Sequence, residues 1–338
     1  MQAAAHVDEW DDGGDLSEVT SCAVGMPAPV SLPLVDAEPT GYANETIDCD
    51  PFAEIIPFPL KGKPGQFPAF MARSGLFSVG FAKGAESLSC KEFIDIPAQG
   101  KYLITLHGSR LTMRDKHLWE SAIEIAKASK LGVGGIFHIP LLDFCKALGW
   151  NDRSAKSREW VWSGLSRLAD ARIKFKLLDG TEGTGTLIST LARREGIVSL
   201  RLNPDFILNA FGRDMQFTMN PARRCQLKST LAQWLHDFFS THTTTPPLSL
   251  GYLRELSGYS GQSRRFPADI MNAMSEIKQA APELVSSFEV HKDSKDGSKW
   301  KLCITKGTEL PAFTMPSRSG FGTNSGNTRS AKQRGVQL

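Results

Sequence analysis

The clearest pattern of apolar and polar positions lies in the middle of the chain, between residues 139 and 191. The stretch from Ile139 to Gly149 has apolar residues at helical spacing, starts beside a proline and ends at a glycine. The next stretch has a basic, serine-rich start, and Val161, Leu165 and Leu168 then recur at i, i+4 and i+7. Two helices are therefore predicted, the second with an apolar back and a polar start.

Two strands are predicted directly after the second helix. Ile173–Leu177 and Leu187–Leu191 are apolar stretches, and the Asp179–Gly180 pair between them favours a turn. A further short strand, Ile136–His138, precedes the first helix and is expected to pair with this hairpin. Helix, turn, basic helix and hairpin is the order of a winged helix-turn-helix, a DNA-binding module. We expect this module to occupy residues 99–212.

Further elements are expected on both sides of this stretch. Upstream, Tyr102–Ser109 and Arg110–Arg114 are predicted to be neighbouring strands, and Asp115 is the predicted N-cap of the helix that follows. One face of that helix is apolar and consists of Leu118, Trp119, Ala122, Ile123 and Ala126. Downstream, Ile197–Leu202 is a predicted strand, and Asn203–Gly212 is a predicted short helix at the joint between two domains.

The module returns without gaps when the sequence is shifted by 109 residues. The matching positions are Leu141 and Leu250, Gly149 and Gly258, Val161 and Ile270, Leu165 and Met274, and Leu168 and Ile277. A strongly amphipathic helix, Leu227–Ser240, begins this second copy, and Ser287–His291 and Lys299–Thr305 form its hairpin. Pro267 falls in the first turn of a helix, where proline is tolerated. A period of this length indicates a domain duplication, and the second module is expected at residues 213–306.

The candidate DNA contacts are the starts of the second helix in each module and the tip of the second hairpin. A recognition helix needs an apolar back and, at its start, long donors that reach base edges and phosphates. The residues that fit are Arg153, Lys156, Ser157 and Arg158 in the first module, Gln262, Ser263, Arg264 and Arg265 in the second, and Lys292, Lys295 and Lys299 in the hairpin. An ordinary solvated helix start would look the same, and the hairpin that follows favours the DNA interpretation. The first hairpin carries Glu182 instead of lysines, which favours the second module as the main DNA contact.

Charge is distributed unevenly along the chain. The sequence has 39 Lys and Arg against 36 Asp and Glu, and residues 1–60 contain twelve Asp and Glu but no Lys or Arg. The remainder therefore carries +15, which favours a polyanionic partner over the alternative of a merely solvated surface. We expect residues 1–52 to be an acidic disordered tail, 53–98 an extended arm or linker, and 307–338 a disordered basic tail that adds phosphate contacts.

The sequence lacks the motifs of several other classes of protein. Six cysteines without CxxC spacing disfavour a zinc site and a disulfide framework and favour the reducing cytoplasm. No run of about 18 apolar residues indicates a membrane span, and the acidic N-terminus lacks the features of a secretory signal. No GxxxxGK[ST], GxSxG or HExxH motif occurs. We therefore expect a cytoplasmic protein that is not an enzyme and uses no cofactor or metal.

With these residues in view, the chain resembles the TrfA-type plasmid replication initiators, a Rep family with two winged-helix domains. The matching strings are FCKALGW and LSRL in the first module and DFFSTH and PLSLGYLRELSGYSG in the second. The string PFPLKGKPGQFPAFMARSGLF resembles the arm that precedes the first module in that family. The resemblance covers residues 53–306 and implies an α+β fold of two tandem winged helices with disordered tails.

The resemblance also implies a function and partners. Such initiators bind direct repeats, called iterons, in double-stranded origin DNA, help to open an adjacent A/T-rich segment, and recruit the host helicase and initiator. Single-stranded DNA of the opened segment is a further expected partner, and a self-dimer is the inactive, copy-control form. Gly65–Phe70 keeps the glutamine of the family's sliding-clamp segment but not the Leu-x-Leu-Phe that follows it. The sequence therefore supports a contact with the sliding clamp less strongly than it supports the other partners.

Two other functions stay open on the sequence alone. A transcriptional repressor with two winged helices would have the same pattern, and only its DNA site, an inverted repeat instead of direct repeats, would differ. A strand-nicking enzyme would need a tyrosine nucleophile such as Tyr252 or Tyr259 near a histidine pair, and the histidines stand apart in sequence. Tyr259 also occupies the position of Trp150 in the other module, which favours a packing role.

Overall fold

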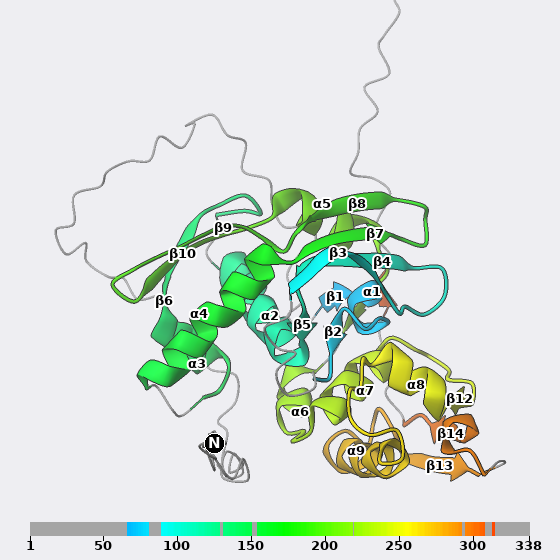
Figure 1. Cartoon of the computed structure of the whole chain (residues 1–338). Helices are drawn as coiled ribbons and strands as arrows, with labels where there is room; N and C mark the ends of the chain where they lie inside the picture. Colours follow the sequence, from blue (N-terminus) through cyan, green and yellow to red (C-terminus); the bar gives the residue numbers. More distant parts are fainter. Residues whose placement is uncertain are drawn as a thin grey trace, which may run out of the picture.

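The computed structural model describes residues 66–80, 89–128, 131–150, 154–218, 220–292, 295–307 and 313–314. Within them helices and mostly antiparallel sheets mix, so the predicted combination of helices and strands is confirmed. The predicted disordered tails, residues 1–52 and nearly all of 307–338, lie outside the described residues. Two helical groups stand apart in Figure 1, with a four-stranded sheet across the top of one of them.

The first unit, as we name it, combines three helices with a three-stranded antiparallel sheet. Its elements are α2 (Met113–Ala128), β6 (Phe137–Pro140), α3 (Leu141–Ala147), α4 (Ala155–Asp170), β9 (Ile188–Arg194) and β10 (Ile197–Leu202). The sheet has the order β6-β10-β9. The apolar stripe predicted for α4 is confirmed, because Val161, Leu165 and Leu168 are fully buried. A side chain at Gly164 would collide with Leu118, so a glycine there allows α4 to approach α2 closely.

The hairpin predicted to complete this unit was wrong. The strand at Ile173–Leu177 is β7 (Arg172–Lys176), and it pairs with β8 (Glu182–Thr186) and with β4 (Leu103–Ser109). Together with β3 (Ser89–Ile96) these strands form a separate sheet of order β3-β4-β7-β8. The strand that pairs with β6 is β10, joined to β9 by a tight turn. A two-residue alternation shows which side of a strand is buried but not its partner, so the sequence pattern could not separate the two hairpins.

The second unit repeats the elements of the first in the same order. It consists of α7 (Thr230–Ser240), β12 (Leu248–Ser249), α8 (Leu250–Leu256), α9 (Phe266–Ala280), β13 (Ser287–His291) and β14 (Lys301–Thr305), with a short 3-10 turn, η2 (Gly297–Lys299), before β14. Its sheet has the order β12-β14-β13, which matches β6-β10-β9. The predicted buried positions Ile270, Met274 and Ile277 are fully buried, and Pro267 lies in the first turn of α9 as predicted.

Two backbone details are the same in both units. The amide of Leu141 donates to the carbonyl of Gly196 at 2.9 Å, and the amide of Leu250 donates to that of Trp300 at 2.8 Å. Each bond connects the start of the short helix to the residue just before the last strand. The turns after α3 and α8 also share a glycine at positive φ, 72° at Gly149 and 63° at Gly258. The duplication predicted from the 109-residue shift therefore extends to backbone geometry.

The chain N-terminal to the first unit contributes to the core. Its elements are β1 (Gln66–Pro68), α1 (Ala69–Ala72) and β2 (Phe77–Ser78), and Phe67, Phe70 and Phe77 are at most 2% exposed. β1 pairs with β11 (Gln216–Thr218), and β11 pairs on its other side with β15 (Phe313–Thr314). The Phe70 ring stacks on Phe175 at 5.7 Å. These residues of the predicted arm therefore pack against β11 and the sheet that contains β7, while the domain boundaries stay a prediction.

Three predicted element boundaries needed correction. Arg110–Arg114 is no neighbour of β4, because β5 (Leu111–Thr112) pairs in parallel with β2 and α2 begins at Met113. Asp115 is not the N-cap but lies in the first turn of α2, where its carboxylate accepts the Thr112 amide at 2.9 Å. The helix predicted from Leu227 begins at residue 230, because the Ser229 side chain caps it. The predicted short helix after Asn203 is confirmed as α5 (Pro204–Arg213).

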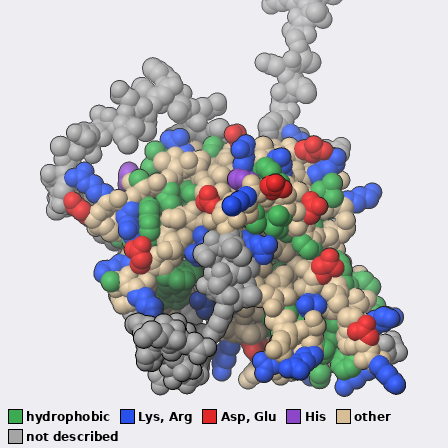
Figure 2. Space-filling model, viewed as in Figure 1, with side chains coloured by type: hydrophobic (Ala, Val, Ile, Leu, Met, Phe, Trp, Pro, Cys, Tyr) green, Lys and Arg blue, Asp and Glu red, His purple; other side chains and the backbone are tan. Residues whose placement is uncertain are grey.

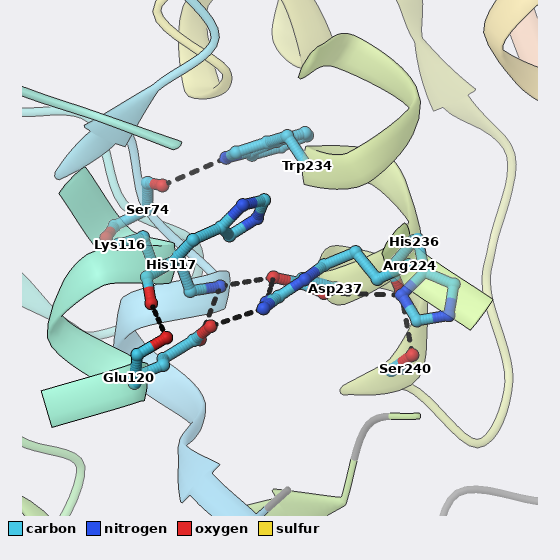
Figure 3. Close-up of polar contacts among 10 residues, drawn as sticks. Ser74, Lys116, His117, Glu120, Arg224, Trp234, His236, Asp237 and Ser240 are labelled. Carbon is cyan, nitrogen blue, oxygen red and sulfur yellow. Dashed lines mark hydrogen bonds and ion pairs between the residues drawn. The ribbon is translucent and has the colours of Figure 1, made fainter. Parts of the chain in front are cut away.

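The two units meet through their first helices, α2 and α7. Four charged side chains at this contact, which we name the junction cluster, are at most 5% exposed (Figure 3). They are Lys116 and Glu120 of α2, Arg224 of α6 (Pro221–Cys225) and Asp237 of α7. Lys116 Nζ lies 2.5 Å and Arg224 Nη1 2.9 Å from Asp237 Oδ2, and Arg224 Nη2 lies 2.5 Å from Glu120 Oε2. Removing one of these charges would leave the others buried without compensation, so the cluster is expected to resist changes at this contact.

Candidate nucleic-acid interface

The start of α4 presents basic side chains to solvent. Ser154 is the N-cap, and its hydroxyl accepts the Ser157 amide at 3.2 Å. Lys156 and Arg158 are exposed, and Ser157 is half-buried. These three residues lie opposite the buried stripe of the helix or at its edge. Arg153, the remaining candidate of the first module, lies outside the described residues. The helix start therefore presents long cationic side chains beside a helix N-terminus, the groups that contact phosphates and base edges.

The start of α9 presents a second polar group of side chains. Gln262, Ser263, Arg264 and Arg265 are all exposed and form the turn that leads into the helix. Arg264 Nε donates to Gln262 Oε1 at 3.0 Å, and Arg265 occupies the N-cap position without a side-chain capping bond. In Figure 2, Lys and Arg side chains gather along the margin of the second unit near α9 and β13. All four candidates therefore lie together at one end of α9.

The solvent side of α9 continues this surface along the helix. Opposite its buried residues the helix presents Ala268, Asn272 and Ser275, all exposed, and Met271 beside them is 44% exposed. Small side chains let a helix approach base edges closely, and asparagine can pair with adenine through two hydrogen bonds. The sequence analysis did not single out these residues. Their signal was the helical spacing itself, since positions half a turn away from a buried stripe face outward.

The hairpin of the first unit ends in a tight turn with basic neighbours. Glu195 and Gly196 both have positive φ, 53° and 82°, as a two-residue hairpin turn requires. The Arg194 side chain is 89% exposed. Arg193 forms an ion pair with Glu159 at 2.7 Å, and its guanidinium lies 4.6 Å from the centre of the Trp162 ring. The sequence analysis missed both arginines because it assigned the first hairpin to the wrong strands. It therefore compared the lysines at the tip of the second hairpin with Glu182.

The hairpin of the second unit carries the predicted lysines. Lys292, Lys295 and Lys299 are all exposed near the connection between β13 and β14. The Lys292 ammonium lies 4.9 Å from the centre of the Trp300 ring, and the Lys299 amide donates to the Asp296 carbonyl. These three predicted residues therefore lie together at one end of the β13–β14 hairpin in the second unit. Residues 293–294 of this connection lie outside the described part of the chain.

A groove of about 540 Å³ separates the start of α4 from the end of the first hairpin. Arg158 and Glu159 line it from the helix, and Arg193 lines it from β9. Leu142 of α3 contributes to its floor. The groove therefore connects a predicted site residue, Arg158, with Arg193, one of the two hairpin arginines that the sequence analysis missed.

The junction cluster lies in the contact between the two units that carry these surfaces. Burial alone would raise the pKa of the Asp237 carboxyl, but the charges of Arg224 and Lys116 hold it well below its ordinary value. The carboxylate therefore stays ionised at neutral pH and keeps both cations in place. In a second buried polar contact Asp214 accepts the Phe70 amide and the Tyr102 hydroxyl, both at 2.8 Å. Burial raises the pKa of Asp214 to about 6 despite these bonds.

One of the two tyrosines weighed as nucleophiles, Tyr259, is held by a hydrogen bond and by ring packing. The Tyr259 hydroxyl donates to Asp269, and its ring packs on Phe266 at 4.8 Å. Burial and this hydrogen bond raise the pKa of Tyr259 to about 12, so the side chain stays neutral. Trp150 in the first unit likewise packs on a ring of the following helix, Trp160, at 4.9 Å. The packing role predicted from the repeat therefore matches the surroundings of both residues.

The described residues contain neither a metal-type cluster nor a membrane-spanning helix. No group of three or more His, Cys, Asp or Glu side chains gathers there in a way that could hold a metal ion. None of the described helices is long and apolar enough to span a membrane.

Comparison with known proteins gives distant similarities of structure. The sequence matches no protein-family model, and no curated protein matches it. A crystal structure of domains 2 and 3 of RctB is similar over 70% of this chain and 97% of that chain, with 11% identity and a TM-score of 0.45. A second structure of RctB domains 2-3 is similar over 62% of this chain and 88% of that chain, with 13% identity and a TM-score of 0.41. Both TM-scores are low, so neither a shared fold nor a shared function follows from them.

Proposed function

We propose that this protein binds duplex DNA through two winged helices and acts as an origin-binding replication initiator. The observation that supports this most is the repeated unit: strand, helix, helix and hairpin occur twice with the same sheet order and the same helix-to-strand hydrogen bond. In the proposal α4 and α9 are the recognition helices, and the β9–β10 and β13–β14 hairpins are the wings. Each helix buries an apolar stripe and exposes a basic start, as base and phosphate contacts require.

The placement of the two units in one chain favours adjacent sites on one duplex. The junction cluster joins α2 to α7, and α2 packs on α4 just as α7 packs on α9. The spacing between the two recognition helices is therefore set within a single chain and not by dimerisation. Such a protein can bind a long site as a monomer, and repeated sites then lie in the same direction. Direct repeats fit this geometry, whereas an inverted repeat needs a twofold-symmetric dimer.

The finer parts of the proposal are supported by the strings shared with TrfA-type initiators. They are binding to iterons, opening of an adjacent A/T-rich segment, recruitment of the host helicase and initiator, and a self-dimer as the inactive form. In this proposal the protein is an assembly factor in the cytoplasm and not an enzyme. The alternative is a transcriptional repressor with the same DNA-binding units.

Footprinting distinguishes these two functions. Purified monomer is incubated with a plasmid origin that carries direct repeats and, separately, with a promoter that carries an inverted repeat. Permanganate reactivity of unpaired thymines then reports strand opening. Protection of each direct repeat by one chain, followed by opening beside the repeats, supports the initiator. Protection of the inverted repeat alone, by a dimer and without opening, supports the repressor and contradicts the proposal.

A further inference from the structure

The four-stranded sheet β3-β4-β7-β8 has one buried and one solvent-exposed face. On the buried side Ile104, Leu106, Ile173 and Phe175 are at most 4% exposed. The other side, which we name the outer sheet face, presents the alternate residues of the same strands. Figure 2 shows part of this region, where hydrophobic, basic and histidine side chains lie close together. Neither the two units nor the junction cluster uses this face.

Strand register places the side chains of the outer sheet face in rows. In one row His107 of β4 lies opposite Arg172 of β7, which lies opposite Thr186 of β8. In the next row Thr105 lies opposite Lys174, and Lys174 lies opposite Thr184. A third row pairs Leu103 with Lys176 and Lys176 with Glu182. Three cations of β7 thus form a column along the middle of the face, with threonine hydroxyls in the neighbouring strands on both sides of it.

An exposed aromatic ring lies beside this column of cations. Phe93 of β3 is 37% exposed, and its ring centre lies 5.3 Å from that of His107. Lys174 Nζ lies 3.8 Å from the centre of the Phe93 ring, the distance of a cation–π contact. Leu103 in the third row is 63% exposed. A large aromatic side chain with a cation above it, on an otherwise solvated sheet, indicates a surface that binds a flat ligand with negative charge nearby.

From this juxtaposition we propose that the outer sheet face binds a single-stranded polynucleotide. Unpaired bases would stack on Phe93 and His107, and the column Arg172, Lys174 and Lys176 would follow the phosphates. A duplex cannot use such a face in this way because its bases are stacked inside the helix, so the ligand is an unpaired strand. Asp95 and Glu182 are the acidic residues of the rows described here, and Glu182 is neutralised by its ion pair with Lys176 at 2.6 Å. With Lys176 paired to Glu182, Arg172 and Lys174 against Asp95 leave a net positive charge on the face, the sign that a phosphate backbone needs.

The position of the face in the fold suits a strand separated next to bound duplex. A single residue, Ala171, joins the end of α4 to the start of β7. The outer sheet face is thus continuous with the first unit along the chain but does not include its helix start or its hairpin. The proposal goes beyond duplex binding by the two units and can succeed or fail independently of it.

The test measures the binding of fluorescein-labelled oligo(dT) and oligo(U) of about 20 nucleotides by anisotropy, with the full chain and variants at fixed salt. Phe93→Ala should weaken oligonucleotide binding about 5- to 100-fold, the usual effect of removing a base-stacking ring. Phe93→Trp should retain binding. Leu103→Ala is the matched control, because it removes an exposed apolar side chain from the same face without removing a ring, and it should change binding less than about 2-fold. Comparison of the two oligonucleotides shows whether DNA or RNA is preferred.

Arg172→Gln and Lys174→Gln test the phosphate contacts separately. Each should reduce the dependence of log K on log salt by about 0.7 for a single strand. Binding to a duplex of direct repeats is measured for every variant and should not change. If wild type binds oligo(dT) but no duplex, the proposed function fails and the present inference stands.

Two outcomes would overturn the inference. Oligo(dT) binding by Phe93→Ala that equals wild type would show that no base stacks on this ring. Sedimentation of wild type as a dimer and of Phe93→Ala as a monomer, with unchanged oligonucleotide binding, would make the outer sheet face a contact between two copies of the chain. Because Phe93 is exposed, thermal melting of the variant should match wild type and exclude loss of folding as the cause.

Discussion

The two units share a framework but differ in what they turn toward solvent. Shifted by 109 residues, the exposed positions Ala268, Asn272, Ser275 and Gln279 of α9 fall on Glu159, Ser163, Ser166 and Asp170 of α4. Two carboxylates thus stand on the outer side of α4 where α9 has a methyl group and an amide. Carboxylates repel phosphates, whereas an asparagine or glutamine can donate to and accept from bases. The comparison favours α9 as the main source of base contacts.

The carboxylates of α4 also have partners within the chain. Glu159 forms an ion pair with Arg193, and Asp170 accepts from the amide and hydroxyl of Ser109, both at 2.7 Å. Arg193 covers Trp162 as well, so part of the outer side of α4 is occupied by its own hairpin. We therefore expect the first unit to position the protein on DNA through Lys156, Arg158 and Arg194. This assignment agrees with the preference for the second unit drawn from the sequence, but for a different reason.

The largest expected effect comes from breaking the link between the units. Asp237→Ala would leave Lys116 and Arg224 buried without their shared carboxylate, which should cost about 3–5 kcal/mol of unfolding free energy. The control is Glu159→Gln, which removes an exposed ion pair with Arg193 and should cost less than about 1 kcal/mol. Urea unfolding followed by circular dichroism gives both values. Equal, small losses would show that the junction cluster does not hold the units together.

Acid should remove the stability that neutral His242 contributes just beyond the end of α7. Burial and the charge of Arg73 lower the pKa of His242 to about 4, and His242 Nε2 lies 2.7 Å from Gln99 Oε1. The unfolded chain therefore binds the proton more tightly, so the contribution of neutral His242 is lost as pH falls from about 6.5 to 4. Asp214 acts in the opposite direction, because its raised pKa of about 6 favours the folded state as pH falls from 6 to 4.

A variant separates these two opposing contributions. The stability of His242→Gln relative to wild type should increase by roughly 2 kcal/mol between pH 7 and pH 4, since it removes one proton-linked penalty and leaves Asp214 unchanged. Urea unfolding at several pH values measures this difference. A difference that does not vary with pH would show that His242 is not held neutral in the folded protein.

Single substitutions in the two recognition helices sharpen the comparison further. Arg265→Ala should reduce affinity for the specific duplex by about 1–3 kcal/mol if the side chain contacts a base edge, and Asn272→Ala should do so within the same range. The matched changes Lys156→Ala and Ser163→Ala in α4 should cost less and should affect specific and unrelated DNA alike. Larger sequence-selective losses in α4 than in α9 would reverse the assignment.

The hairpin lysines should have the smallest effect. Lys295→Ala should weaken binding to all sequences alike and reduce the slope of log K against log salt by about 1, because it removes one phosphate contact. Arg194→Ala is the equivalent change in the first hairpin and should behave similarly. Titrations at several salt concentrations on specific and unrelated duplexes provide the slopes. A loss confined to one sequence would contradict phosphate contact by either hairpin.

The sequence predicted the parts of the fold that depend on local patterns. The buried stripes of α4 and α9 follow from helical spacing, and both glycine turns follow from the repeat. The partner of a strand depends on residues far away in the chain, so the β7–β8 hairpin was confused with β9–β10. The junction cluster was also beyond prediction, because Lys116, Arg224 and Asp237 look like ordinary surface charges until α2 and α7 meet. Among the site residues, Arg193 and Arg194 could be recognised as candidates only once the β9–β10 hairpin was assigned correctly.

Hydroxyl-radical footprinting with unit-specific variants tests the central claim most directly. The claim is that one chain contacts two adjacent duplex segments, one through each unit. Wild-type monomer on a duplex with direct repeats should protect two neighbouring segments per chain. The Lys156→Ala, Arg158→Ala double variant should weaken protection of one segment, and the Arg264→Ala, Arg265→Ala double variant should weaken the other. Protection of a single segment by wild type, or equal weakening of both segments by either variant, would contradict the account.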